Sequence, residues 1–221
     1  MQITVGILED DPLTRSAIAE SLESRGFKVV VKASSAVEFL SQFKRTPMDV
    51  ALLDLHLGEG PTGVDVATQI RSANKILGIV FLTSFSDPRL LSPSLKELPK
   101  GSRYVTKGSI DDISLLEAEI HASIADVEGA ANRWHSDLDQ LTDGQIETLR
   151  LVAAGYTNSQ IAKERYVTEK TVEATLSRIA KVLNLNLPQG HNARIHMAQV
   201  YFRARGMEVY DGTLNQDSSG H

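Results

Sequence analysis

Four short strand-like runs in this sequence each stop at polar side chains whose types suit the chemistry of a phosphoryl group. The side chains that follow residues 3–8, 50–53, 78–82 and 103–106 are, in that order, Glu9 with Asp10, Asp54, Thr83 and Lys107. Carboxylates that are packed together repel each other unless a cation is present, and hard oxygen ligands favour Mg²⁺. A carboxylate beside Mg²⁺, with a lysine and a hydroxyl nearby, suits attack on phosphorus to form an acyl phosphate.

The elements that must position these groups are strands buried on both faces. Residues 50–53, for example, form a continuous apolar run that stops at Asp54, as a buried parallel strand does. Such runs alternate with apolar stripes of helical spacing up to residue 125, which predicts an α/β domain with a covered parallel sheet. Because the carboxyl ends of parallel strands share one edge, the four groups can converge there. The alternative is that they are unrelated turn residues at the ends of strands.

The composition limits the classes of protein to which the 221-residue chain can belong. Its length allows one large domain or two small ones. It has no cysteine, which excludes disulfide frameworks, thiolate metal sites and cysteine nucleophiles and fits a reducing cytosol. No apolar run approaches the length of about 18 residues that a membrane span needs, and the N-terminus leads directly into a strand pattern. We therefore expect a cytoplasmic protein with no membrane span and no secretory signal.

From residue 138 onward the strand patterns stop and short helical patterns follow one another. Thr142 and Thr157 each precede a glutamine by three residues, which is the capping-box pattern of a helix start. A longer helix after Thr168 carries lysine and arginine, and a short helix joined by a tight turn to a longer basic one is typical of a helix-turn-helix. Residues 138–207 hold nine Lys/Arg and six Asp/Glu, or +3, so the remainder of a chain of net charge −5 carries −8. This asymmetry favours a polyanion as partner.

Residues 1–125 resemble the receiver domain of a two-component response regulator, a five-stranded parallel domain of flavodoxin-like fold. The resemblance rests on five strand-end residues in the same order along the chain: Glu9, Asp10, Asp54, Thr83 and Lys107. It implies that Asp54 is the phosphoacceptor for a sensor histidine kinase. Thr83 is then expected to donate a hydrogen bond to a phosphoryl oxygen, and Lys107 to pair with its charge.

The same resemblance implies a Mg²⁺ site and a switch residue. Asp10, Asp54 and the backbone carbonyl of His56 would hold the ion, with Glu9 acting through a water molecule. Tyr104, three residues before Lys107, matches an aromatic position that swings inward on activation, following Thr83. The alternative reading of Tyr104 is an ordinary core tyrosine.

Two stretches depart from the receiver pattern. Gly58 stands where the family usually has proline. The loop from Gly58 to Gly63 is one residue longer than usual. The stretch between Thr83 and Lys107 is two residues longer than usual and contains Pro88, Pro93 and Pro99, so that any helix there is short or broken. Both stretches flank the surface that responds to phosphorylation, which predicts an unusual route for the signal.

Residues 141–185 resemble the LuxR-type helix-turn-helix, and the whole chain thereby resembles the NarL/FixJ class of response regulators. The resemblance places residues 170–181 in the major groove of double-stranded DNA. The residues expected at phosphates are Lys170, Thr171, Arg178 and Lys181, and those expected at base edges are Glu173, Ala174 and Ser177. Glu173 stands where the family usually has a basic residue, so it should weaken DNA binding unless it accepts from a cytosine amine. The alternative is that Glu173 is a solvated surface charge.

The predicted domains are therefore a receiver domain over 1–125, a linker over 126–137, a helix-turn-helix domain over 138–207 and a disordered tail over 208–221. The last helix, from about Asn192 to Ala204, has two apolar faces, and we assign Met197 and Tyr201 to a homodimer interface. A two-fold dimer suits inverted half-sites in the DNA.

The sequence thus predicts a phosphorylation-dependent transcription regulator rather than an enzyme. One alternative keeps this fold but places DNA binding or dimerisation under a control other than phosphorylation. A phosphohydrolase with an aspartyl-phosphate intermediate is less well supported, because His56 stands where such an enzyme has its second aspartate. A protein that binds another protein and no DNA is a third reading, motivated by Glu173.

Overall fold

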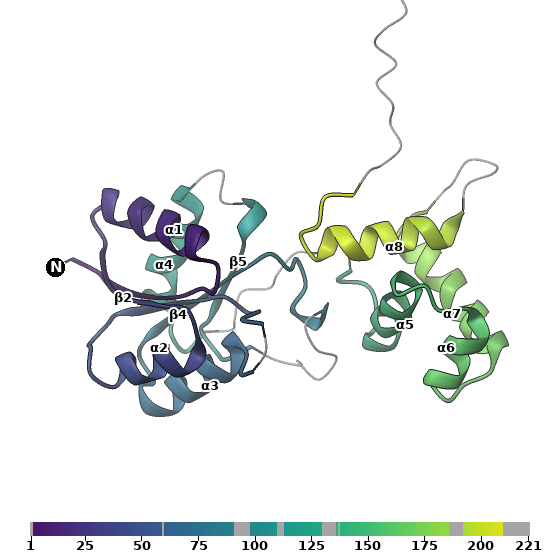
Figure 1. The fold of residues 1–221 in the computed structure, drawn as a ribbon, viewed down its shortest axis with the longest axis horizontal. Helices are drawn as coiled ribbons and strands as arrows, with labels where there is room; N and C mark the ends of the chain where they lie inside the picture. Colours follow the sequence, from purple (N-terminus) through teal and green to yellow (C-terminus); the bar gives the residue numbers. More distant parts are fainter. Residues whose placement is uncertain are drawn as a thin grey trace, which may run out of the picture. The chain divides into compact units, whose positions relative to one another are not determined.

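The computed structural model describes residues 2–58, 60–90, 98–109, 113–129, 136, 138–185 and 192–209. The chain forms two compact units (Figure 1). The first consists of Met1–Ser84 and Leu95–Trp134, and the second of Phe85–Ser94 and His135–His221. The predicted receiver domain, residues 1–125, includes the stretch directly after residue 84, which the structure groups with the second unit. The physical reason is that Phe85 and Leu90 belong to the hydrophobic core of the second unit.

The first unit contains the predicted five-stranded parallel sheet. Its strands are β1 (Thr4–Leu8), β2 (Lys28–Ala33), β3 (Val50–Leu53), β4 (Gly78–Thr83) and β5 (Arg103–Thr106). Their order is β2-β1-β3-β4-β5, and each neighbouring pair is parallel. All residues of β3 and β4 are buried, as their continuous apolar runs predict. The carboxyl ends of the strands therefore lie along one edge of the sheet.

Helices cover both faces of this sheet. They are α1 (Pro12–Ser24), α2 (Ala36–Phe43), α3 (Gly63–Ala73) and α4 (Ile113–Ala125). Figure 1 shows α1 and α4 on one face of the sheet and α2 and α3 on the other. The predicted cap of α1 is present, because the Asp11 side chain accepts a hydrogen bond from the amide of Thr14 and Pro12 opens the helix.

The stretch between β4 and β5 is described over residues 84–90 and 98–102. In these residues the one helical element is a 3₁₀ turn, η1 (Pro88–Leu90), which agrees with the predicted short or broken helix. Of the predicted linker, residues 126–129 and 136 are described, and the amide of Gly101 donates to the carbonyl of Gly129 over 2.8 Å. The beginning of the linker therefore packs within the first unit. Linker residues 130–135 and 137, and residues 210–221 of the predicted tail, lie outside the described residues.

The second unit is helical and contains α5 (Asp143–Ala153), α6 (Asn158–Glu164), α7 (Glu169–Val182) and α8 (Ala193–Ala204). Capping boxes at Thr142 and Thr157 start α5 and α6, and Thr168 caps α7, as predicted. The buried stripes of these helices form one core with residues that include Leu149, Ile161 and Ile179.

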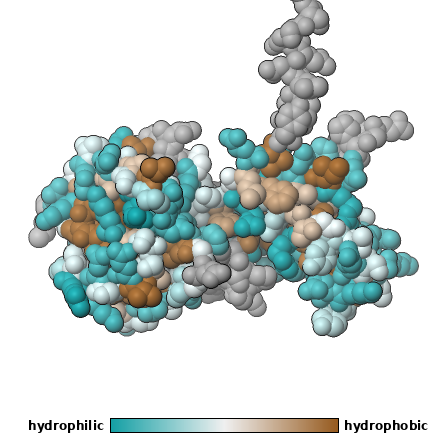
Figure 2. Space-filling view, viewed as in Figure 1, coloured by the Kyte–Doolittle hydropathy of each residue, from teal (hydrophilic) through white to brown (hydrophobic). Residues whose placement is uncertain are grey.

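Figure 2 shows a mainly hydrophilic face over α6 and α7, whereas hydrophobic residues gather over α8. Among the described residues, no helix is both long enough and apolar enough to cross a membrane.

Candidate functional site

The structure brings three of the predicted strand-end residues into direct contact. The ammonium nitrogen of Lys107 lies 2.7 Å from Glu9 Oε2 and 2.8 Å from Asp54 Oδ2. Glu9 follows β1, Asp54 follows β3 and Lys107 opens the 3₁₀ turn η2 (Lys107–Ser109) after β5. Both carboxylates are buried, with 2% and 6% of their surfaces exposed. The geometry expected of parallel strands has therefore assembled a site from residues almost a hundred positions apart.

Backbone contacts hold Asp54 in place. Its amide donates to the carbonyl of Leu8 over 2.9 Å, which ties the end of β3 to the end of β1. Its Oδ1 accepts the amide of His56 over 3.2 Å. At the start of α3, a Cβ on Gly63 would lie 2.0 Å from the Asp54 carbonyl oxygen, so only glycine allows this close approach. The imidazole of His56 itself is exposed.

The loop that carries the acidic pair is held by a residue that sequence reasoning did not single out. The Arg15 guanidinium, from the first turns of α1, donates through Nη1 to the carbonyls of Glu9 and Asp10. An arginine one helical turn into the helix is the signal that could have indicated this role. Its position fixes the backbone from which both carboxylates project.

Burial and the charges of the site together raise the pKa values of both Glu9 and Lys107. Burial raises the pKa of Glu9, a hydrogen bond from Lys107 opposes this, and the Asp54 charge raises it again, so that the pKa ends above its ordinary value. Burial lowers the pKa of Lys107, but the charges and hydrogen bonds of Asp54 and Glu9 together raise it above its ordinary value. The site thus stabilises the ammonium form of Lys107 at neutral pH.

The donor set of the site fits a hard divalent cation. Carboxylate oxygens of Glu9, Asp10 and Asp54 lie within 4.8 Å of one another. Asp10 is exposed whereas the other two are buried, so solvent reaches the cluster from one side. Three ionised carboxylates and the Lys107 ammonium leave a charge of −2, which a divalent cation would neutralise. Oxygen ligands with open positions for water are what Mg²⁺ requires.

The two predicted switch residues lie on neighbouring strands. Thr83 ends β4 and is completely buried, and Tyr104 in β5 pairs with Phe81 and is 7% exposed. Tyr104 is therefore already inside the protein in this structure. Its burial fits both the core reading and the inward position of the switch reading.

On the second unit, α7 presents the predicted DNA-contacting residues to solvent. Lys170, Thr171, Glu173, Ala174, Ser177, Arg178 and Lys181 are all exposed. Val172 and Ile179 on the opposite face have no exposed surface and anchor the helix to the core. The Ser177 hydroxyl donates to the carbonyl of Glu173 over 3.0 Å, so this hydroxyl is already engaged with its own helix.

The structure overturns the predicted dimer residues. Met197 and Tyr201 are only 2% and 5% exposed and belong to the core of the helical unit. Both apolar faces of α8 have helical spacing, so the spacing alone does not show which face packs in the core and which is open to a partner. The face that remains open carries Ile195, which is 57% exposed, with Ala198 and Phe202 partly exposed.

Sequence reasoning also missed the pair Asp87 and Arg89 in the stretch after β4. Asp87 has no exposed surface, and Arg89 Nη2 lies 2.6 Å from its Oδ2. Asp87 precedes Pro88 as Asp11 precedes Pro12, so the signal of a helix start was present in the sequence. The partners of Arg89 in the second unit had no comparable signal.

Comparison with known families identifies the two units. Residues 5–118 match the response regulator receiver domain, and residues 139–188 match the bacterial regulatory proteins of the luxR family. The chain belongs to the response regulator family. Because a receiver domain precedes a luxR-type DNA-binding domain, this response regulator is a phosphorylation-dependent transcription regulator of the NarL/FixJ class. Its receiver domain implies a sensor kinase as partner, and its luxR-type domain implies DNA.

Relatives over nearly the whole length support this membership. The response regulator is 29% identical to the nitrate/nitrite response regulator protein homolog of Haemophilus influenzae, over 84% of this chain and 92% of the relative. It is 28% identical to the oxygen regulatory protein NreC of Staphylococcus epidermidis, over 81% and 90%. A solved structure of two RcsB dimers bound to two parallel DNAs has a TM-score of 0.57 at 20% identity, and covers 90% of this chain and 99% of that one. At this identity the similarity to RcsB shows the shared fold.

Proposed function

We propose that Asp54 is the residue of this response regulator that accepts the phosphoryl group from a sensor histidine kinase. The observation that carries the proposal is the pair of contacts from Lys107 to Asp54 and Glu9, 2.8 and 2.7 Å long, at the shared edge of the sheet. A carboxylate oxygen of Asp54 attacks the phosphorus of a phosphohistidine. The new O–P bond forms as the N–P bond breaks, and the electron pair of that bond returns to the imidazole.

The other residues of the site prepare this transfer and receive its product. Asp10, Asp54 and the backbone carbonyl of His56 would hold Mg²⁺, and Glu9 would act through a water molecule. The ion, when bound, screens the charge of the incoming phosphoryl oxygens. Lys107 then pairs with the phosphoryl group in place of the Asp54 carboxylate, and the Thr83 hydroxyl donates to a phosphoryl oxygen. Tyr104 keeps its buried position when Thr83 moves.

The helical unit binds DNA. Lys170, Thr171, Arg178 and Lys181 on α7 contact DNA phosphates, and Glu173, Ala174 and Ser177 face base edges. Support comes from the exposure of all seven residues on one helix whose opposite face is buried. Two copies pair through the open face of α8, so that the bound DNA carries inverted half-sites. Such a protein acts in the cytoplasm and as a transcription factor rather than as a catalyst of metabolism.

To test this assignment of Asp54, the full chain is incubated with Mg²⁺ and a small-molecule phosphodonor, and the mass of the intact protein is measured. Wild type should gain one phosphoryl group, and Asp54→Asn should gain none. Asp11→Asn is the matched control, because asparagine also caps a helix and Asp11 lies next to the acidic pair. It should be labelled like wild type. Labelling of Asp54→Asn at the wild-type level would show that the phosphoacceptor is another residue.

A second candidate function keeps DNA binding but places DNA binding or dimerisation under a control other than phosphorylation. The observation in its favour is that the described residues between β4 and β5 hold only the 3₁₀ turn η1 and that residues 85–90 belong to the helical unit. Sedimentation of the protein with and without Mg²⁺ and a phosphoryl mimic separates the two modes. Equal self-association in both samples, in a protein shown to bind the mimic, would favour control by another signal.

A further inference from the structure

Residues 85–90, which follow Thr83 after one intervening residue, belong to the DNA-binding unit. Phe85 and Leu90 are 5% and 7% exposed and lie in the hydrophobic core formed by α5 to α8. The Arg205 guanidinium at the end of α8 stacks over the Phe85 ring at 5.4 Å. One residue, Ser84, separates the end of β4 from this docked segment.

A hydrogen bond joins the docked segment, residues 85–90, to the end of α8. The amide of Ser86 donates to the carbonyl of Ala204 over 2.8 Å, and its hydroxyl lies 3.3 Å from the same oxygen. The last carbonyls of a helix have no partner within the helix. Ser86 therefore satisfies a group that the end of α8 would otherwise leave to solvent.

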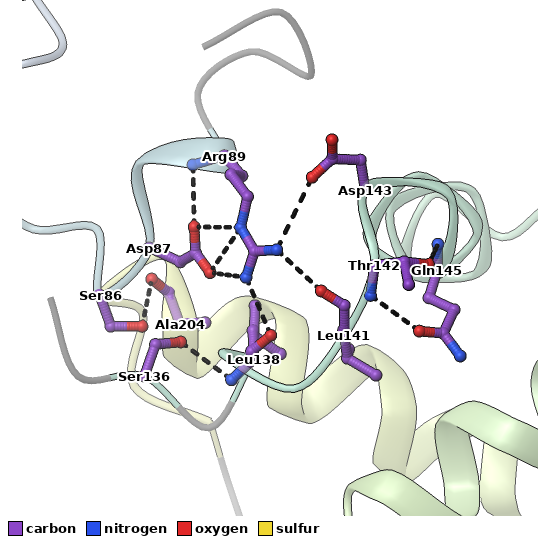
Figure 3. Close-up of polar contacts among 10 residues, drawn as sticks. All are labelled: Ser86, Asp87, Arg89, Ser136, Leu138, Leu141, Thr142, Asp143, Gln145 and Ala204. Carbon is purple, nitrogen blue, oxygen red and sulfur yellow. Dashed lines mark hydrogen bonds and ion pairs between the residues drawn. The ribbon is translucent and has the colours of Figure 1, made fainter. Parts of the chain in front are cut away.

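Arg89 joins the docked segment to the start of α5 (Figure 3). Its Nη1 donates to the carbonyl of Leu141 over 2.7 Å, and its Nη2 donates to the carbonyl of Leu138 over 2.9 Å. Its Nε and Nη2 also bind the buried Asp87 carboxylate, with a shortest distance of 2.6 Å. Asp143, in the first turn of α5, lies 3.7 Å from Nη1. The guanidinium thus uses its fork of donors to fix residues on both sides of one turn.

We propose that the docked segment is the mechanical connection through which phosphorylation at Asp54 alters the DNA-binding unit. The proposal rests on the proposed function of Asp54 and Thr83. Two Cα–Cα steps span at most about 7 Å, so the chain from Thr83 to Phe85 has little slack. When Thr83 moves toward a phosphoryl group, the displacement reaches Ser86 and Arg89 without a linker to absorb it.

The two arrangements compete for the same short piece of chain. In one, residues 85–90 are fully docked on α5 and α8; in the other, Thr83 is drawn to the phosphoryl group and the docking is weakened. Coupling of this kind is reciprocal by thermodynamic linkage: the factor by which docking disfavours phosphorylation is the factor by which phosphorylation disfavours docking. The docked segment therefore opposes phosphorylation in the resting protein and loosens its hold on the ends of α5 and α8 in the phosphorylated one.

The alternative is that the docked segment has a structural role only and completes the core of the helical unit. Hydrogen exchange on the full chain separates the two readings. After phosphorylation of wild type, confirmed by intact mass, the peptide containing Ser86 should exchange at least about fivefold faster. Asp54→Asn treated in the same way should not change. Unchanged exchange around Ser86 in fully phosphorylated wild type would overturn the proposal.

A pair of insertions tests the connection itself. A Gly-Ser-Gly insertion between Ser84 and Phe85 gives the connection slack and leaves every docking residue in place. The matched control carries the same insertion between Trp134 and His135, the later point at which the chain passes between the two units. The probe is a double-stranded DNA selected from a random pool by the wild-type protein. Protection of the Ser86 amide is measured in both variants to show that the docking persists.

The first insertion should take up the phosphoryl group like wild type but lose the change in DNA affinity that phosphorylation causes. The control should keep this change. A wild-type response in the first variant, or loss of the response in both, would overturn the proposal. Failure of the proposed function looks different, because wild type would then take up no phosphoryl group at all.

Discussion

Lys107 and Asp54 form an ion pair of 2.8 Å between the ends of β5 and β3, and the same ammonium lies 2.7 Å from Glu9. The lysine thus already balances part of the negative charge that three adjacent carboxylates create. A phosphoryl group on Asp54 would take over the lysine as partner. We propose that this exchange of partners is the local event that starts the switch.

Replacing this lysine should destabilise the receiver domain. Lys107→Met leaves Glu9 and Asp54 buried without a counter-ion, which costs on the order of 3 kcal/mol of the free energy of unfolding. Mg²⁺ should recover part of this loss, and should raise the urea midpoint of the variant more than that of wild type. Lys44→Met, at an exposed position after α2, is the control. A variant that is as stable as wild type without Mg²⁺ would show that the ion pair contributes little.

Loss of Arg89 should destabilise the helical unit although Arg89 lies about fifty residues before α5 in the sequence. Arg89→Ala leaves the buried Asp87 carboxylate without its counter-ion. It also removes the hydrogen-bond donors of the Leu138 and Leu141 carbonyls. We expect a loss of about 3 kcal/mol, measured by hydrogen exchange of α5 in increasing urea. The double variant Asp87→Ala/Arg89→Ala should lose less than the sum of the single variants, because no unpaired charge remains. Additive losses would mean that the two side chains act independently.

The sequence was sufficient to predict the sheet and the meeting of Glu9, Asp54 and Lys107 at its edge. Strands that are buried on both faces leave a continuous apolar run, and the edge they share places Asp54 beside Lys107 whatever the intervening loops do. Helix starts were equally predictable, because the cap at Thr142 depends on residues within one turn. These features are local or follow from the topology of a parallel sheet.

Two features could not be predicted because they depend on which surfaces meet. On α8, Met197 and Ile195 lie in apolar stripes of the same spacing, and only the packed core shows that Met197 is buried while Ile195 is 57% exposed. Arg89 has a local partner in Asp87, but its bonds to Leu138 and Leu141 join segments about fifty residues apart. No periodicity in the sequence indicates such a contact.

The corrected face of α8 leads to a prediction about self-association. Ile195→Glu should weaken dimer formation by the phosphorylated protein, because a charge on the open apolar face cannot be buried in a two-fold interface. The variant should fold normally, since the side chain is 57% exposed. Sedimentation of phosphorylated wild type and variant over a range of concentrations measures the effect. Met197→Glu is the contrasting substitution and should disrupt the fold instead. Equal dimerisation of wild type and Ile195→Glu would place the interface elsewhere.

Reversing the charge of Glu173 should strengthen DNA binding. Glu173 is exposed in the middle of α7, between Lys170 and Arg178. Glu173→Lys removes a repulsion and adds a phosphate contact, so log K should fall more steeply with log salt, by about 0.9 per added contact. Glu164→Lys, at the exposed end of α6, is the control for net charge. An equal gain in both variants would mean that Glu173 does not face the DNA.

The central claim is that phosphorylation of Asp54 controls DNA binding, and one titration tests it most directly. Wild type and Asp54→Asn are each titrated against a selected double-stranded DNA, with and without prior incubation with phosphodonor and Mg²⁺. We expect the affinity of wild type to change at least about fivefold on phosphorylation and the affinity of Asp54→Asn not to change. Equal affinities of labelled and unlabelled wild type, or an equal change in Asp54→Asn, would contradict it.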